Sequence, residues 1–461
     1  MHFEELPAEV VLKIFSYLSQ ACLVIVANVS KSWKKLAFDP YLWTDVRIDS
    51  RMQSAQDVRD VLDRATMIRK LDVSGGTVHL SVVASASKQF SRLSHLAIEG
   101  RALSHPSMPD ILRNCPSLTG ITLCGENTLL PNEIRVLENL SSLKALRAHP
   151  LHIQDEGIRQ ISASCPKLQR LMFNSDRISR KDTWDCLHCL RYLTRLYITE
   201  ISTAGLLHAS KSCPNLESLS IWIIHNKNDV TAAQALQGFV KLKVLTVSGE
   251  CGSGWFDAAF KTPRWLEHLD VPGLTIKRHH FKEIVKSCRD TLRHIGMNGR
   301  ALGPDSLGML SECRNLESIT VFALSGLNLL LSNFCHFPKL TRVQLSVTGS
   351  MTHVIRQLTQ IVDILDTSRH GGTRLVLTVY CSSQASQNAM VREVSLFKDF
   401  LALNTCLSHQ HIQDIEQQCW RIKDTKLFWL PLGGEVMRTI KTSFPATSKT
   451  LKNLSIAIRE H

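Results

Sequence analysis

The sequence predicts an α/β protein: a curved solenoid of parallel strands and helices, preceded by a small all-α domain of about three helices. Three observations predict this fold class. A short apolar pattern returns at nearly constant spacing along most of the 461 residues. Apolar residues at helical spacing fill the intervals between its copies. Residues 6–43 do not fit the repeat and have helical periodicity instead.

The repeated pattern is Leu-x-x-Leu-x-apolar, and it recurs every 23 to 26 residues. Self-similarity of this kind is the signature of a leucine-rich-repeat solenoid, with strands on the concave face and helices on the convex face. Twelve copies predict regular repeats over residues 49–350. Their first apolar residues are Ile68, Leu93, Leu118, Leu143, Leu168, Leu193, Leu216, Leu242, Leu266, Leu292, Leu316 and Leu340.

A cysteine, often followed by proline, precedes several of these strands. Cys115, Cys165 and Cys213 each end a run of helically spaced apolar residues, and the proline after each turns the chain toward the next strand. Other repeats have Leu or Phe at this position, which suits a core but not a metal site. The three cysteines also lie two repeats apart, beyond the reach of a disulfide. We expect them to be buried, reduced thiols.

Beyond residue 350 the pattern weakens. Strands are expected near 375–380, 401–403, 427–432 and 451–456, with helical stretches between them. Residues 351–461 are therefore expected to form degenerate repeats, and a separate C-terminal cap is the alternative.

The composition is that of a folded protein with excess positive charge. Hydrophobic residues make up 44% and charged residues 21%, and 54 Lys and Arg against 41 Asp and Glu give a net charge of +13. This balance favours acidic, phosphorylated or nucleic-acid partners without choosing among them. Because no secretory signal or membrane-spanning stretch is seen, we expect a cytoplasmic or nuclear protein, or both, without membrane contact.

No pattern of catalytic, cofactor-binding or metal-binding residues stands out. Cys186, His188 and Cys189 lack a second ligand pair at zinc-finger spacing, and the leucines beside them fit a core. No nucleophile elbow, zinc-protease motif or phosphate-binding loop was found. A protein that is not an enzyme, without cofactor or metal, is expected.

The N-terminal helices carry more large apolar side chains than a domain of their size can bury, so the surplus should dock on another surface. Their spacing resembles the F-box, and with the repeats the chain resembles the F-box/leucine-rich-repeat proteins. The resemblance makes residues 1–48 the F-box, although Gln20-Ala21-Cys22 replaces the usual polar start of its second helix. The matching residues are Leu6, Pro7, Glu9, Val10, Ile14, Phe15, Leu18, Trp33, Leu36, Ala37, Asp39, Pro40, Leu42 and Trp43.

This resemblance implies the substrate receptor of an SCF-type cullin-RING ubiquitin ligase. The F-box would bind a Skp-family adaptor, with Leu6, Pro7, Ile14, Phe15 and Leu18 as candidate contacts, and Trp33 and Trp43 as either contacts or core. The solenoid would bind the target. The alternative is a basic leucine-rich-repeat scaffold or nucleic-acid-binding protein outside any ligase, with nucleic acid the less expected partner.

Four residues are candidates for target binding. Residues between the buried positions of each strand point to the concave face. There, Arg170, Arg195, Tyr197 and Trp222 fall on three consecutive repeats. Arg and large aromatic residues dominate binding hot spots, and paired Arg suits a carboxylate or phosphate. We expect a protein target with an acidic or phosphorylated segment, and a merely solvated face is the alternative.

Overall fold

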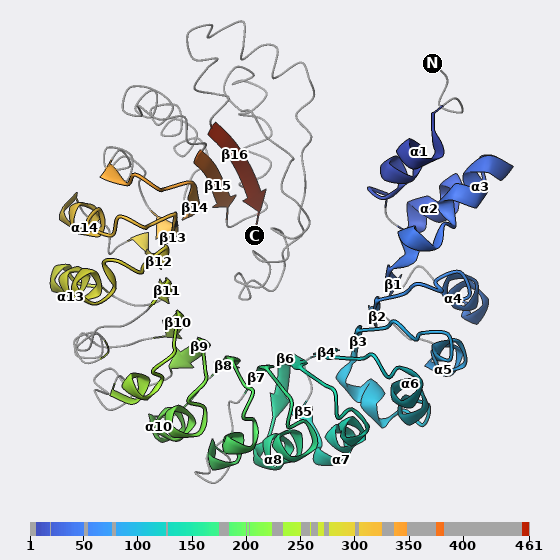
Figure 1. Cartoon of the computed structure of the whole chain (residues 1–461), viewed down its shortest axis with the longest axis horizontal. Coiled ribbons are helices and arrows are strands. Elements are labelled where there is room, and N and C mark those ends of the chain that lie inside the picture. The colour runs from blue at the N-terminus through green and yellow to red at the C-terminus, as the bar shows by residue number, and fades with distance from the viewer. Residues whose placement is uncertain are drawn as a thin grey trace, which may run out of the picture. The chain divides into compact units, whose positions relative to one another are not determined.

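The computed structural model describes most of the chain up to residue 347 and two short segments beyond it. The chain divides into two compact units, one of residues 1–221 with 238–240, the other of residues 222–237 and 241–461. In each unit, strands lie on one side of the chain and helices on the other (Figure 1). The described residues are 6–18, 20–49, 54–75, 80–125, 128–174, 184–199, 201, 203–223, 234–249, 259, 266–271, 276–299, 304–324, 336–347, 375–381 and 454–460.

The first unit begins with three short helices, α1 (Ala8–Phe15), α2 (Gln20–Val26) and α3 (Lys31–Ala37), followed by the 3₁₀ turn η2 (Pro40–Trp43). Polar side chains start the last two elements. Ser30 Oγ accepts a hydrogen bond from the Trp33 backbone N–H at 3.1 Å at the beginning of α3. Asp39 accepts one from the Tyr41 N–H at 2.9 Å at the turn. Both are ordinary N-caps, which the sequence signals by Ser and Asp.

A parallel sheet follows directly from these helices, because its first strand begins two residues after η2. The residues of each strand pair in register with those of the next, with β5 pairing only the end of β6. The strands are β1 (Asp45–Asp49), β2 (Lys70–Gly75), β3 (His95–Glu99), β4 (Gly120–Cys124), β5 (Thr128–Leu129), β6 (Ala145–Ile153), β7 (Arg170–Asn174), β8 (Arg195–Thr199) and β9 (Ser218–Ile223).

Helices and 3₁₀ turns alternate with these strands and cover the other side. They are α4 (Ala55–Leu62), α5 (Leu80–Ser87), η3 (Gly100–Ser104), α6 (Met108–Asn114), α7 (Pro131–Arg135), η4 (Val136–Asn139), α8 (Asp155–Ser164), η5 (Cys186–Cys189) and α10 (Thr203–Ser212).

One backbone contact recurs where most of the strands begin. The carbonyl of the residue before the strand accepts hydrogen bonds from two consecutive N–H groups of the next repeat. Thr44, for example, accepts from Arg69 at 2.7 Å and Lys70 at 3.0 Å, and Arg69 accepts from Ser94 at 2.8 Å and His95 at 3.1 Å. This doubled contact fixes the register, so that the same repeat position faces the core in every strand.

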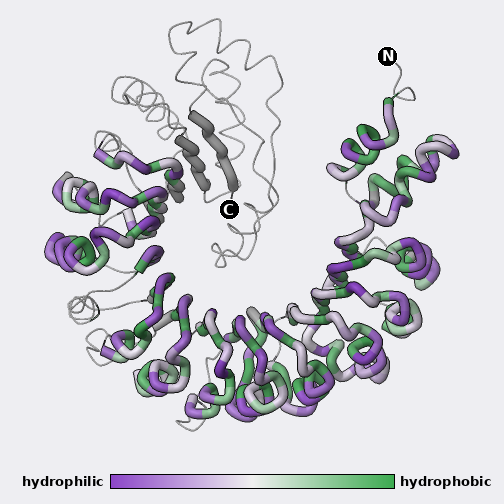
Figure 2. Tube along the Cα trace, in the orientation of Figure 1, coloured by the Kyte–Doolittle hydropathy of each residue, from purple (hydrophilic) through white to green (hydrophobic). Residues whose placement is uncertain are grey.

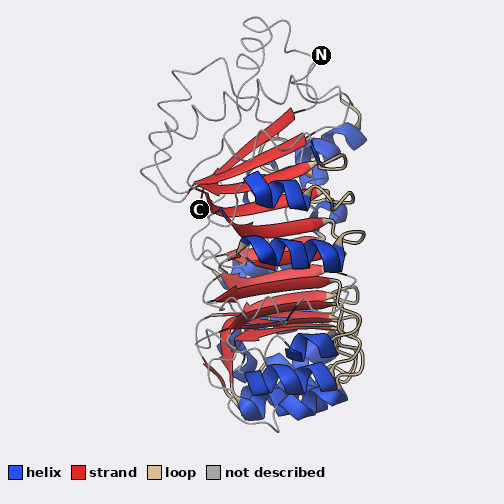
Figure 3. Ribbon diagram, turned by 90° about the vertical axis from the view of Figure 1, so that its left-hand side faces the viewer, coloured by secondary structure: helices blue, strands red, loops and turns tan. Residues whose placement is uncertain are grey.

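The second unit continues the same arrangement. Its strands pair in parallel and in chain order, and Figure 3 shows strands of the chain as a stack of arrows. They are β10 (Val244–Gly249), β11 (His268–Val271), β12 (His294–Asn298), β13 (Ser318–Leu324), β14 (Arg342–Val347), β15 (Leu375–Cys381) and β16 (Leu454–Glu460). The helices described in this unit are α13 (Arg278–Cys288) and α14 (Pro304–Leu310), and the 3₁₀ turn η6 (Leu236–Gly238) begins in it.

The core lies between the sheet and the helices, and Figure 2 shows apolar residues recurring along both. The first apolar residue of all twelve repeats is buried, with exposed fractions of 0 to 3%. Cys115, Cys165 and Cys213 are buried free thiols, and burial raises the pKa of each to about 12. The predicted fold class and the core role of these cysteines are confirmed.

The pattern beyond residue 350 is only partly covered by the structure. The strand expected near 375–380 is β15. The strand expected at 451–456 is found at 454–460, where Ile456 pairs with Leu377. β16 pairs directly with β15, so no other strand lies between them. The strands expected at 401–403 and 427–432 and the domain boundary at 350 lie outside the described residues.

Candidate functional site

Helix α1 has apolar side chains on two faces. Val11 and Phe15 point inward, where the Phe15 ring meets the Trp33 ring edge to face with 5.7 Å between centroids. Val10, Ile14 and Tyr17 lie on the opposite face, with exposed fractions of 42, 38 and 76%. Their spacing of four and three residues places these three side chains in one stripe along the helix and the turn after it.

The exposed apolar surface continues onto the neighbouring elements. Among the described residues, large apolar side chains are exposed mostly in this N-terminal domain, and only Leu130, Tyr192 and Val240 are exposed elsewhere. Concentrated exposure of this kind is typical of a surface that another protein covers. The exposed residues of the domain are Val10, Ile14, Tyr17, Val24, Ile25, Val29 and Tyr41.

The five residues predicted as adaptor contacts differ in exposure. Pro7 and Ile14 are exposed, whereas Leu6 and Leu18 are half-buried. Phe15 is only 1% exposed, so its ring cannot touch a partner unless the domain rearranges. The prediction of Phe15 as a direct contact therefore does not fit the structure. Its ring holds α1 against α3 and so supports the exposed stripe from beneath.

The two tryptophans are part of the packing. Trp33 is half-buried against Phe15, and Trp43 is fully buried. The indole N–H of Trp43 donates to the Ala37 carbonyl at 2.9 Å, which satisfies its polar group inside the core. Phe38 packs beside Trp43, and the guanidinium of Arg64, just after α4, lies 4.2 Å above the Phe38 ring. These contacts fasten the helical domain to the first repeat.

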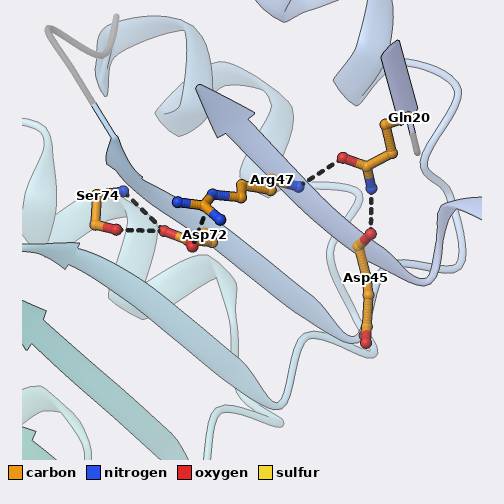
Figure 4. A network of polar contacts seen from close by, with 5 residues as sticks. All are labelled: Gln20, Asp45, Arg47, Asp72 and Ser74. Atoms are coloured by element: carbon orange, nitrogen blue, oxygen red, sulfur yellow. Dashed lines mark hydrogen bonds and ion pairs between the residues drawn. The ribbon is translucent and has the colours of Figure 1, made fainter. Parts of the chain in front are cut away.

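Gln20 provides a second attachment, which Figure 4 shows. Its side-chain amide donates to the Asp45 carbonyl and accepts a hydrogen bond from the Arg47 backbone N–H at 2.9 Å. A side chain thus satisfies the open edge of β1, which ends the order of the described strands. Arg47 continues the network, because its guanidinium lies 3.5 Å from the Asp72 carboxylate.

The concave face of β7 and β8 brings three of the four predicted target-binding residues together. Arg170 pairs in register with Arg195, and both side chains are exposed. Tyr197 pairs with Met172, and both are half-buried. Trp222 belongs to the second compact unit, and its side chain is not among those described, so nothing places it beside the other three.

The cations on the concave face differ in their partners. Near the N-terminal end, Lys70 lies 3.2 Å from the Asp45 carboxylate and Arg47 lies close to Asp72. Arg170 and Arg195 make no ion pair with any residue that the structure describes. Their charges are therefore available to an external anion.

The second unit carries a polar cluster that the sequence analysis did not single out. His294 Nε2 lies 2.9 Å from Asp270 Oδ1, and the His268 ring stacks on the His294 ring with 5.6 Å between centroids. Burial, and then the nearby His294, lowers the pKa of His268. No sequence motif marks these residues, because outward positions follow no repeat pattern. Over the described ranges, no group of three His, Cys, Asp or Glu residues is placed to hold a metal ion.

Comparison with known proteins bears on the N-terminal helices. Residues 3–49 match the family model described as F-box-like. The chain carries an F-box-like domain. This domain contains α1 to α3, the buried Trp43 and the first strand of the sheet, and the resemblance read from the sequence is confirmed for it. Its family match and its exposed apolar stripe therefore fall on the same residues.

The F-box protein FBW2 of Arabidopsis thaliana is 25% identical over 209 residues, which is 42% of this chain and 66% of that protein. Among solved structures, the Rad7 and Elc1 complex in yeast is similar with a TM-score of 0.48 and 14% identity, covering 72% of this chain and 94% of that one. An internalin from Listeria monocytogenes is similar with a TM-score of 0.34 and 17% identity, covering 68% of this chain and 93% of that one.

None of the described helices is long and apolar enough to span a membrane.

Proposed function

We propose that the protein is a substrate receptor of an SCF-type ubiquitin ligase. It has no catalytic role of its own: the F-box-like domain binds a Skp-family adaptor and, through it, a cullin-RING ligase. The concave face of the repeats holds a protein target. The observation that carries the proposal is the exposed apolar stripe Val10, Ile14 and Tyr17 on an F-box-like domain whose other side is fixed to the sheet.

The packing supports this division of roles. Apolar burial at a protein interface is favourable by about 25 cal/mol for each Å² removed from water, so an exposed stripe is a ready docking surface. The opposite side of the domain is held by Trp43 and by Gln20 on the edge of β1. A target bound on the repeats would thus be held near the adaptor, which raises its effective concentration at the ligase. This role would place the protein in the cytoplasm, the nucleus or both.

Adaptor binding tests the proposal. The 461-residue chain should bind a purified Skp-family adaptor in a pull-down and in titration calorimetry. Tyr17→Asp should weaken this binding by about tenfold or more, because it places a charge within an apolar interface. Tyr192→Asp is the matched control, since Tyr192 is also an exposed tyrosine, 59% exposed, but lies outside the F-box-like domain. It should leave adaptor binding unchanged.

Two outcomes would overturn the proposal. One is an unmodified chain that binds no Skp-family adaptor. The other is binding to RNA or DNA that falls steeply with salt and occurs without adaptor association. The second outcome would favour a basic scaffold or nucleic-acid-binding protein.

A further inference from the structure

We infer that the concave face of β7 and β8 selects an extended target segment with a carboxylate side chain followed, two residues later, by an apolar one. The inference rests on the proposed function, because it specifies what the repeat surface of the receptor recognises. Three rows of paired residues on these two strands carry it.

The rows change in chemistry along the strands. Arg170 and Arg195 form a cationic first row, and Met172 and Tyr197 form an apolar and aromatic second row. Asn174 and Thr199 form a neutral third row, in which the Thr199 hydroxyl donates to the Asn174 side chain. The residues between the rows point into the core: Leu171, Phe173, Leu196 and Ile198.

The spacing of the rows matches that of an extended peptide. Alternate residues of a strand lie about 6.6 Å apart on the same face. A target segment lying along β7 and β8 has the same repeat, so its residues i and i+2 meet the first and second rows together. For a segment that runs in the same direction as the strands, the order of the rows gives an order of side chains: acidic, any residue, apolar.

The positive charges of the first row favour the binding of an anion. Arg170 and Arg195 occupy paired positions on adjacent strands, about 4.8 Å apart, where like charges repel. Neither has a carboxylate at ion-pair distance within the described part of the chain, whereas Lys70 and Arg47 on the first two strands each have one. An external anion between the two guanidinium groups would relieve this repulsion.

The neighbours of the two arginines favour a carboxylate. On the β6 side the next residues of the same row are Ala145 and Gly120, which offer no side-chain donor, and on the β9 side the row continues with Ser218, which offers one neutral hydroxyl. Two guanidinium groups match the two oxygens of a carboxylate, whereas the third oxygen of a phosphate would meet no further cation beside the two arginines and only the neutral Ser218 hydroxyl.

Selection from a library of random linear peptides on the intact chain, bound to its adaptor, tests the inference. We expect enrichment of Asp or Glu with an apolar or aromatic residue two positions later. The double variant Arg170→Glu and Arg195→Glu should lose this preference and enrich Lys or Arg at the first position. Arg113→Glu is the control, because Arg113 is exposed on α6, away from the strands, and this variant should retain the original preference.

The inference is overturned if the intact chain enriches no acidic residue, or if the double variant selects the same peptides as the unmodified chain. Peptides synthesised with phosphoserine in place of the acidic residue, and single-stranded oligonucleotides, complete the test. Tighter binding of either than of the carboxylate peptide would also overturn it. Adaptor binding and the thermal unfolding midpoint are measured on each variant. An unmodified chain that binds the adaptor but enriches no acidic peptide would refute the inference and leave the ligase role standing.

Discussion

The side chain of Gln20 and the backbone N–H of Arg47 form a hydrogen bond of 2.9 Å that joins the second helix of the F-box-like domain to the first strand of the solenoid. The same amide also donates to the Asp45 carbonyl. One side chain thus supplies a donor and an acceptor to a strand edge, as a neighbouring strand would. The helical domain is therefore attached to the repeats by contacts at β1 as well as by the packing of Trp43.

Gln20→Ala should expose the edge of β1. Each hydrogen bond contributes about 0.5 to 1.5 kcal/mol, so the loss of two should make the Arg47 amide exchange its hydrogen with solvent roughly tenfold faster or more. Hydrogen exchange measured by mass spectrometry on the peptide containing β1 checks this. Gln20→Glu keeps the acceptor for Arg47 but loses the donor, so its exchange rate should lie between the two. Equal exchange in all three proteins would contradict the edge-capping role.

Phe15 and Ile14 are adjacent apolar residues with opposite environments. Phe15→Ala should destabilise the F-box-like domain by about 3 to 5 kcal/mol, because it empties a core position against Trp33. Ile14→Ala should cost much less stability, because Ile14 is exposed, but should weaken adaptor binding directly. Hydrogen exchange of α1 measures the stability of the domain and titration with the adaptor measures binding, so the two measurements together separate the two effects. Similar loss of stability in both variants would mean that the two faces of α1 are misassigned.

Substitution by alanine should lower the stability of the protein at one helical glycine and raise it at another. A Cβ at Gly205, on α10, would lie 2.6 Å from the buried Trp184 ring nitrogen, so Gly205→Ala should cost about 1 to 3 kcal/mol through overpacking. A Cβ at Gly308, on α14, would meet nothing within 4 Å. Gly308→Ala should therefore stabilise its helix by up to about 1 kcal/mol. Thermal unfolding midpoints that fall for the first and rise for the second would support the packing described.

The buried cysteines should be unreactive while the protein is folded. Burial raises the pKa of Cys165 to about 12, so at pH 8 almost none of it is thiolate. Maleimide labelling followed by mass spectrometry should modify the exposed Cys22 and Cys189 and leave Cys165 untouched until denaturant is added. Cys165→Ser should destabilise the first unit by about 1 to 3 kcal/mol, because it buries a hydroxyl among apolar neighbours. Rapid labelling of Cys165 under native conditions would contradict its assignment to the core.

The repeat register could be predicted from sequence because every strand alternates between core and surface and repeats the same pattern. Leu171 and Leu196, for example, pair in the structure as the alignment of repeats requires. The same argument fails for α1, where Val10 and Val11, and Ile14 and Phe15, are apolar neighbours. Helical periodicity alone cannot decide which member of each pair is buried.

Features that depend on outward-pointing side chains are harder to predict from the sequence. Arg170, Arg195 and Tyr197 were found because their columns follow from the register. The contact of Gln20 with β1 was not, because it joins residues 25 and 27 positions apart in sequence without any pattern. The direct pairing of β15 with β16 is a similar case, since a degenerate repeat offers no register from which to infer it.

His268 should make the stability of the second unit depend on pH. Burial and the neighbouring His294 lower the pKa of His268 below its ordinary value of 6.5, against the opposing effect of Asp270 and Glu267, while Arg342 lowers it further. The folded protein therefore resists protonation of this ring more than the unfolded chain does. As pH falls below about 6.5, the unfolded chain takes up the proton first, so stability is lost through that range and down to the folded pKa. Above about pH 7.5 both states are neutral and the effect vanishes.

His268→Gln removes this titrating group while keeping a polar side chain of similar length. Its urea midpoint should fall less between pH 7.5 and pH 5.5 than that of the unmodified protein. Carboxylates elsewhere titrate equally in both proteins, so the difference between the two pH dependences isolates His268. The control is His188→Gln, because His188 is exposed on η5 of the first unit. An identical fall in midpoint for the unmodified protein and His268→Gln would show that the histidine ring is not held in its neutral form by the fold.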